Sequence, residues 1–444
     1  MAVEKILRTE KLKMEHEVNT ALEDIRVLDL AGQSGVYCTK LLADLGADVI
    51  RIEPPDGDPM RQLAPFYHDE PGPERSLYYW HFNTSKRGIT LNLTIPTGQE
   101  IFKKLVNTAD ILVETFQPGY LDSLGLNHEI LRAINPRLIH VSITGFGQAG
   151  PYSCFKSTDL IGQAMSGILY TTGFPEDPPT SLGASQAYHM VSANAAIGAL
   201  IALQYRDLIG NGQNVDIPMQ GTNLRMSEMV PFTYWVSGRN RQRSGLEYYR
   251  MQRDNFDCKD GRVICSALGG GGAEQMLNWM ESEGMAGDLR DEKYVDVIAA
   301  MMGAAPPGRG SKRNVNQRPP KSLKDYPDEI PHIEEVWQTF LNTHTMEELF
   351  VGAQTRGVRL MPVNNVKNVV EDIGLKERNY FVDVSHPELE RIFTYPGAPY
   401  RLSETPWRIS RRAPLIGEHN LEIYGEELGY GLNEIEEMKK AGTI

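Results

Sequence analysis

The sequence predicts an α/β protein with a parallel sheet and a smaller second domain. Three observations lead to this prediction. Buried-strand patterns alternate with amphipathic-helix patterns through the first 150 residues. The 444 residues exceed the usual size of a single domain. The composition changes near residue 240, where the chain becomes polar. Strands separated by helices of this length imply βαβ units and a parallel sheet with helices on its faces.

The elements of the sheet follow in order along the chain. Short apolar runs predict the strands, and apolar residues at helical spacing predict the helices between them. Pro96 is suited to a first helical turn. The expected strands cover 25–30, 48–53, 88–93, 111–116 and 137–144, and the expected helices cover 36–45, 96–109 and 129–134.

The rest of the chain predicts one long helix and a smaller domain. Small residues spaced for close packing favour a buried helix at 189–205. The Gly-, Pro- and basic-rich segment 301–321 indicates a loop. Further elements are a strand at 262–267, helices at 275–280 and 333–341, a return to compact structure at 357–366 and an acidic helix at 434–440.

Composition and charge exclude several classes of protein. The net charge of −13 argues against a nucleic-acid-binding protein, which needs a surplus of Lys and Arg. The four cysteines lack a CxxC pair, so we expect free thiols in a reducing compartment. The charged first 20 residues do not resemble a signal peptide, and no run of 18 apolar residues occurs. We therefore expect a cytoplasmic protein without a membrane partner.

The segment TGFGQAGPY contains a GxGxxG pattern at Gly145, Gly147 and Gly150, directly after a predicted strand. A dinucleotide-binding fingerprint needs a helix at the third glycine and an acid about 20 residues later. Here Pro151 and a polar loop follow, so we do not expect a nicotinamide or flavin cofactor. A glycine loop at the carboxyl end of a parallel strand remains a place where ligands bind, which suggests a ligand site near 144–160.

Other motifs allow two interpretations each. The four glycines at 269–272 suit either a lid over a substrate or a surface turn. Lys86 and Arg87 could hold a phosphate or could simply be solvated. Lys156 and Asp159 could serve a ligand, or the acid could cap the next helix. The sequence contains no metal-site spacing and no GxSxG motif, so we expect no metal.

Several phrases in succession resemble the family III coenzyme A (CoA) transferases. RVLDLAGQSGVYCTKLLADLGADVIRIEPPDGDP begins this series, and the likeness continues in order over nearly the whole chain. The other matching segments are 83–93, 114–126, 144–152, 159–173 and 210–219, followed by RGVRLMPVNNV and PLIGEHN.

The resemblance implies a Rossmann-like large domain built from both parts of the chain, an inserted small domain, and two subunits interlocked like rings. We expect the large domain at 1–235 and 346–444 and the small domain at 236–345. It also implies CoA and acyl-CoA as substrates, with no permanently bound cofactor. The residues expected to bind CoA are Gln33, Ser34, Leu91, Thr115, Phe116 and Lys156, with Arg51 and Lys86 assisting at the phosphates. Thr115 replaces an asparagine that is usual in the family.

The sequence departs from the family at its nucleophile. Family members carry an aspartate about ten residues after Pro178 and Pro179, and that carboxylate accepts the acyl group. Tyr188 occupies this position, and residues 178–206 contain no Asp or Glu. Asp159 is the nearest acid in the motif region and the candidate substitute. Related racemases need a histidine where Thr158 stands, so racemase activity is not expected.

Three hypotheses follow from the resemblance. The first is a subunit of a heteromeric CoA-transferase whose homologous partner carries the aspartate, as in transferases that activate benzylsuccinate. The second is a homodimeric enzyme that uses another residue, or a CoA-ester reaction without covalent capture. The third is a non-catalytic protein that binds a CoA ester. The sequence does not specify the acyl donor or the acceptor acid.

Overall fold

The computed structural model describes residues 20–243, 255–265, 272–301 and 326–444. The predicted loop at 301–321 and the glycines 269–271 fall largely outside these ranges. The chain divides into two compact units. The first comprises 1–170, 180–241 and 374–444, and the second comprises 171–179 and 242–373. The domain limits predicted from the sequence, at 235/236 and 345/346, stay predictions.

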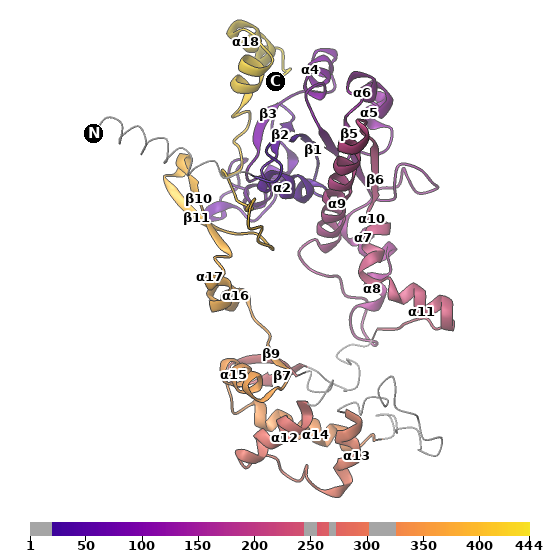
Figure 1. Cartoon of the computed structure of the whole chain (residues 1–444), viewed down its shortest axis with the longest axis vertical. Coiled ribbons are helices and arrows are strands. Elements are labelled where there is room, and N and C mark those ends of the chain that lie inside the picture. The colour runs from indigo at the N-terminus through magenta and orange to yellow at the C-terminus, as the bar shows by residue number, and fades with distance from the viewer. Residues whose placement is uncertain (1–19, 244–254, 266–271, 302–325) are drawn as a thin grey trace, which may run out of the picture. The chain divides into compact units, whose positions relative to one another are not determined.

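A six-stranded parallel sheet forms the centre of the first unit (Figure 1), which confirms the predicted α/β fold. The strand order is β3-β2-β1-β4-β5-β6. The strands are β1 (Arg26–Leu30), β2 (Asp48–Glu53), β3 (Arg87–Thr90), β4 (Ile111–Glu114), β5 (Ile139–Thr144) and β6 (Asn214–Pro218). The central strands are buried on both faces, as expected for parallel sheets covered on both sides.

Helices cover both faces of this sheet. On one face, α2 (Val36–Asp44) and α9 (Gln186–Ile209) pack on each other and form an apolar cluster with β1, β4 and β5. On the other, α4 (Pro96–Val106), α6 (His128–Ile134) and α18 (Leu432–Lys440) contribute to a second cluster. Successive residues of one strand, such as Val27 and Leu28, enter opposite clusters, which is the period-two pattern of a strand.

Other elements of the first unit are short or lie beyond the inserted segment. They are α3 (Leu77–Phe82), α5 (Tyr120–Ser123), α7 (Asp159–Met165), α8 (Ile168–Thr171), α10 (Met219–Leu224), α11 (Met229–Ser237), α17 (Ile373–Glu377) and the hairpin β10–β11 (Phe381–His386, Arg391–Pro396). A π-helical turn covers Leu421–Glu427.

The second unit has its own core. Its antiparallel sheet has the order β7-β8-β9, with strands at Asn255–Cys258, Gly261–Cys265 and Leu360–Pro362. Trp279, Trp337 and Phe340 lie in its apolar cluster. Its helices are α12 (Gly272–Ser282), α13 (Glu292–Met301), α14 (Glu329–Leu341), α15 (Met346–Arg356) and α16 (Val366–Glu371).

Candidate functional site

The order of the sheet places a switch point between β1 and β4, because the chain proceeds outward from β1 in one direction and from β4 in the other. Ligands of open α/β sheets bind beside such a point, at the carboxyl ends of the strands. A cavity of about 460 Å³ lies there, and we call it the switch-point cavity. Its lining is Leu30, Gly32, Gln33, Arg51, Ile52, Glu53, Pro54, Asp58, Pro59, Met60, Leu63, Leu91, Asn92, Leu93, Thr94, Thr115, Phe116 and Tyr120.

Five of the eight residues predicted to bind CoA line this cavity together. They are Gln33, Arg51, Leu91, Thr115 and Phe116, which come from the ends of four different strands. The local contacts explain their arrangement. The Gly32 N–H donates to Thr115 Oγ1 over 2.7 Å, so the loops after β1 and β4 are joined. The rings of Phe116 and Tyr120 lie 4.6 Å apart and form an aromatic wall.

The other three predicted residues lie elsewhere. The Ser34 carbonyl accepts a hydrogen bond from Ser192 Oγ on α9, over 2.8 Å. Lys156 is exposed in the turn before α7. Lys86 is fully buried and its ammonium donates to Asp29 Oδ2 (2.9 Å), Thr39 Oγ1 (2.8 Å) and Asn83 Oδ1 (3.0 Å). The interpretation of Lys86 as a solvated surface charge is therefore wrong, and Arg87 is engaged in ion pairs with Asp48.

Arg51 is the cationic residue in the lining of the switch-point cavity, and two acids compensate its charge. Its guanidinium donates to Asp29 Oδ1 over 2.9 Å and pairs with Asp58. Its Nε has no hydrogen-bond partner among the described residues. The lining is otherwise mostly apolar, and this suits a planar apolar group such as a nucleobase better than it suits a diphosphate.

A second charged group, which no sequence motif indicated, supports the cavity wall. Arg61 is 1% exposed and makes a bidentate ion pair with Glu53 through its Nε (2.7 Å) and Nη2 (2.8 Å). The Glu53 carboxylate in turn accepts the Asp58 N–H over 2.8 Å. The Tyr79 ring lies 3.8 Å from the guanidinium carbon. Although burial opposes ionisation, Arg61 keeps the pKa of Glu53 below its usual value.

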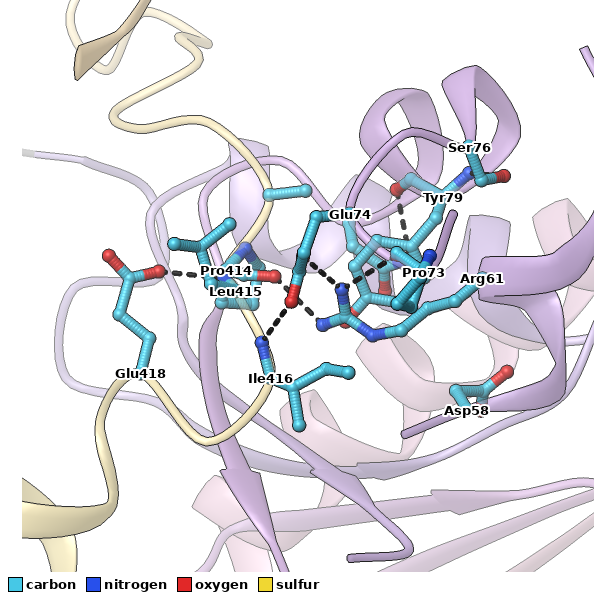
Figure 2. Close-up of polar contacts among 12 residues, drawn as sticks. Asp58, Arg61, Pro73, Glu74, Ser76, Tyr79, Pro414, Leu415, Ile416 and Glu418 are labelled. Carbon is cyan, nitrogen blue, oxygen red and sulfur yellow. Dashed lines mark hydrogen bonds and ion pairs between the residues drawn. The ribbon is translucent and has the colours of Figure 1, made fainter. Parts of the chain in front are cut away.

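A segment from late in the chain closes this group, as Figure 2 shows. The Pro414 carbonyl accepts a hydrogen bond from Arg61 Nη2 (2.9 Å), and the Ile416 N–H donates to Glu74 Oε1 (2.9 Å). Glu74 also pairs with Arg61 over 2.7 Å. We call residues 410–420 the C-terminal strap. The strap therefore holds the loop after β2 through one buried arginine.

Tyr188, at the position predicted for the nucleophile, lies in the first turn of α9 and is half-buried. Its backbone N–H donates to Asp159 Oδ1 over 3.1 Å. The other oxygen of Asp159 accepts from Gln163 Nε2 over 2.7 Å. Asp159 therefore caps α9, while Thr158 caps α7, the helix that Asp159 begins. The structure thus supports a capping role for Asp159, but at α9 and not, as expected, at α7, the next helix.

Tyr78 joins this region although the sequence analysis did not identify it. It is half-buried, and its ring lies 4.6 Å from that of Phe82. Burial raises the pKa of Tyr78 to about 12, against the effect of the Gln33 side chain, and the charge of Asp159 adds to the increase. Burial also raises the pKa of Tyr188. Both phenols are therefore neutral hydrogen-bonding groups near neutral pH.

The described residues contain no group of three or more His, Cys, Asp or Glu side chains arranged to hold a metal ion. Within the same residues, no helix is long and apolar enough to cross a membrane. Fold and site together define an α/β protein with a Rossmann-type strand order and a cavity at the switch point, where open α/β sheets bind their ligands.

Comparison with known proteins identifies the family. Residues 22–420 match the model of CoA-transferase family III. The chain is 32% identical to the succinyl-CoA:(R)-benzylsuccinate CoA-transferase subunit BbsE of Thauera aromatica, over 94% of this chain and 97% of the relative. It is 35% identical to a formyl-CoA:oxalate CoA-transferase of Streptomyces avermitilis, over 96% and 99%. The chain belongs to CoA-transferase family III.

A solved structure agrees with this assignment. A CaiB/BaiF family protein from Brucella suis superposes with a TM-score of 0.78 at 27% identity, over 92% of this chain and 99% of that one. The predicted family and fold class are confirmed. Members of the family use CoA esters as substrates, so the predicted substrate class is also confirmed. The interlocked dimer and the individual CoA contacts stay predictions.

Proposed function

We propose that this chain is the subunit without a nucleophile in a heteromeric CoA-transferase, and that a homologous subunit carrying an aspartate completes the enzyme. The observation that carries the proposal is Tyr188 in the first turn of α9, within a segment, 178–206, that contains no carboxylate. The enzyme would move CoA from an acyl-CoA donor to a carboxylic acid.

The chemistry of the transfer explains why the missing carboxylate matters. A carboxylate attacks the donor thioester, forms a mixed anhydride and releases the CoA thiolate. The thiolate then attacks the aspartyl carbonyl, which releases the donor acid and leaves CoA as an enzyme thioester. The acceptor carboxylate and the thiolate repeat these two steps in reverse. A phenol cannot form an anhydride, and burial of Tyr188 raises its pKa further.

Asp159 is the alternative nucleophile, and its contacts argue against this role. One oxygen accepts the Tyr188 N–H and the other accepts the Gln163 amide. Attack on a thioester would leave the N-terminus of α9 without its cap, which costs about 1 kcal/mol. Whichever oxygen attacked would also have to leave a well-formed hydrogen bond. We therefore assign Asp159 to positioning α9.

The outer face of α9 supports association with another subunit. Ile197, Ile201, Tyr205 and Leu208 follow each other at helical spacing and are 56%, 64%, 48% and 75% exposed. Met229, Phe232 and Trp235 on α11 are also exposed, between 53% and 78%. An apolar stripe of this kind on a well-folded domain marks an interface. Its occupant in our proposal is the aspartate-bearing homologue, in an interlocked arrangement.

The relatives suggest the substrates. One relative is named for succinyl-CoA and (R)-benzylsuccinate, which favours succinyl-CoA as donor and an aromatic succinate as acceptor. In our proposal the switch-point cavity takes the nucleotide part of CoA, with Gln33, Leu91, Thr115 and Phe116 in its wall. Arg51 also lines this cavity, and the predicted contacts from Ser34 and Lys156 form part of the same proposal. Lys86 is left out of it, because its ammonium is fully buried against Asp29, Thr39 and Asn83.

The test measures both turnover and covalent capture. CoA transfer from succinyl-CoA to aromatic and aliphatic acids is assayed with this chain alone, with an aspartate-bearing homologue alone, and with both. Intact-mass analysis after incubation with succinyl-CoA shows which chain carries the CoA thioester. We expect turnover only in the mixture and a CoA adduct only on the homologue.

Other outcomes distinguish the alternatives. Full activity of the lone chain with a CoA adduct on it would refute the heteromer, and loss of that adduct in Asp159→Asn would identify Asp159 as the nucleophile. Binding of CoA esters without turnover in any combination would instead identify a non-catalytic CoA-ester-binding protein. Asp177→Asn is a matched control, because Asp177 lies outside α7 and outside the contacts around Tyr188.

A further inference from the structure

A second, smaller cavity lies beside β4 and β5. Its volume is about 120 Å³, and we call it the β4–β5 cavity. Glu114, Asn127, His128, His140 and Ser142 are among its lining residues. Glu114 and His140 are each only 4% exposed. The proposed transfer reaction uses none of these side chains, although a buried carboxyl and a buried imidazole are costly to place without a role.

The polar groups of this cavity are incompletely paired. Both ring nitrogens of His140, and Nδ1 of His128, lack a hydrogen-bond partner among the described residues. His140 Nε2 lies 3.8 Å from Glu114 Oε1, which is beyond a direct hydrogen bond. A space of this size with several polar neighbours suits water, which would bridge the two side chains. The carboxyl group of Glu114 therefore has a path to exchange protons.

Glu114 also connects this cavity to the switch-point cavity. Its Oε2 accepts the Phe116 N–H over 2.6 Å. Phe116 and its neighbour Thr115 line the switch-point cavity, and Thr115 Oγ1 accepts the Gly32 N–H. One carboxyl group thus fixes the loop after β4 from behind, while the front of that loop faces the ligand.

We propose that Glu114 is a positioning residue for the CoA ester, and that its protonation through the β4–β5 cavity changes how firmly it holds Phe116 in the wall of the switch-point cavity. The inference rests on the proposed binding of CoA there. A carboxylate accepts an N–H more strongly than a carboxylic acid does, by roughly a factor of two. The ionised form of Glu114 therefore holds the loop more firmly.

The surroundings of Glu114 place this change near neutral pH. Burial raises the pKa of Glu114 to about 7, against a hydrogen bond from Ser142, and the charge of Asp216 on β6 adds to the increase. Burial lowers the pKa of His140 to about 4 and also lowers that of His128 on α6. Both imidazoles are therefore neutral when Glu114 titrates. Asp122 on α5 completes the charged lining of the β4–β5 cavity.

The test compares loop protection and CoA affinity between pH 6 and 8. Hydrogen exchange of the peptide that contains Phe116 is measured without ligand and corrected for intrinsic exchange rates. Affinity for CoA is measured by calorimetry. The variants are Glu114→Gln, which keeps an acceptor but does not titrate, and Ser142→Ala. Glu129→Gln is the control, because it removes an exposed acid on α6 without contacting Glu114.

We expect wild-type affinity for CoA to rise about three- to tenfold more across pH 7 than the affinity of Glu114→Gln, and loop protection to rise in parallel. The titration of the CoA phosphates is common to both proteins and cancels in the comparison. Because the Ser142 hydrogen bond lowers the pKa of Glu114, Ser142→Ala shifts the midpoint to higher pH. Glu129→Gln follows the wild type.

Identical protection and identical pH dependence in wild type and Glu114→Gln would overturn the inference. If no protein binds CoA, the proposed function fails. In that case the exchange measurement still decides whether Glu114 positions the loop, because it needs no ligand. If Glu114→Gln loses protection by the same amount at every pH, Glu114 supports the loop through a structural contact. That result would overturn the proposed effect of Glu114 protonation on the loop.

Discussion

Arg61→Met tests whether the buried charges around the switch-point cavity act as one group. The substitution keeps much of the side-chain volume and removes every polar contact of the guanidinium. Glu53 then remains fully buried without its ion-pair partner, and its remaining hydrogen bonds come from the Tyr79 hydroxyl (2.8 Å) and the Asp58 N–H. The Pro414 carbonyl loses its donor as well.

The expected loss in the free energy of unfolding of the first unit is about 3–5 kcal/mol at pH 8, the cost of leaving one buried charge without its partner. Arg75→Met is the matched control. Arg75 and its partner Glu70 are 42% and 64% exposed, so removing this surface ion pair costs less than about 1 kcal/mol. The double variant Glu53→Gln/Arg61→Met recovers part of the loss, because no uncompensated charge remains.

The pH dependence supplies an independent check. In Arg61→Met, burial dominates and the pKa of Glu53 in the folded state rises above its unfolded value. The folded state then binds more protons, so the variant loses stability as pH rises and approaches the wild type at low pH. Urea unfolding followed by circular dichroism, with hydrogen exchange of β2 peptides to isolate the first unit, measures both effects. A loss below about 1 kcal/mol, or one that is the same at pH 5 and pH 8, would refute the reasoning.

Two further predictions concern association and titration. Ile201→Glu, in the exposed stripe of α9, should lower the mass that light scattering measures for the complex with the aspartate-bearing homologue. Val351→Glu on α15 is the control and should leave this mass unchanged. Equal masses for both variants would exclude α9 as the interface. Glu114→Gln should be more stable than the wild type by about 3 kcal/mol above pH 7. The pKa of Glu114 is about 7 in the folded state against 4.5 in the unfolded state, so the wild type loses stability as pH rises from 4.5 to 7. Equal urea midpoints of the two proteins at pH 8 would contradict this prediction.

The sheet was predictable because its signals are local. The strand at Asp48–Glu53 has the predicted limits, and the helix expected at 36–45 ends one residue earlier, at Asp44. The apolar runs are long enough to identify these segments as strands. Pro96 is the first residue of α4, as predicted. The strand expected to reach residue 93 ends at Thr90, since pairing with β2 stops there and apolarity alone does not set the end.

The site was predictable only in part, because its geometry depends on strand order. The glycine loop at 145–150 drew attention to residues 144–160, yet the switch-point cavity lies at the ends of β1 to β4. The order of the strands along the sequence does not reveal that β1 pairs with β4 in the sheet. The family resemblance identified Gln33 and Phe116, which physical pattern alone did not.

Buried charges were the main omission. Arg61 and Glu53 are eight residues apart and look like ordinary surface residues in the sequence. Their burial depends on Pro414, which is 353 positions away from Arg61. Lys86 likewise is buried because Asp29 and Thr39 surround it, and neither is a sequence neighbour. No local pattern encodes contacts of this range.

The C-terminal strap also affects the order in which the protein can fold during synthesis. At about 5–20 residues per second, a ribosome needs roughly 20–70 s to proceed from Arg61 to Pro414. Throughout that interval the loop after β2 lacks the carbonyl that completes its arginine contacts, and Ser85 lacks the Arg411 carbonyl to which its N–H donates over 2.9 Å. The inserted second unit is translated within this interval and can form its own core first. The contacts that residues 410–420 make with Arg61 and Ser85 can therefore form only after the whole second unit has been translated.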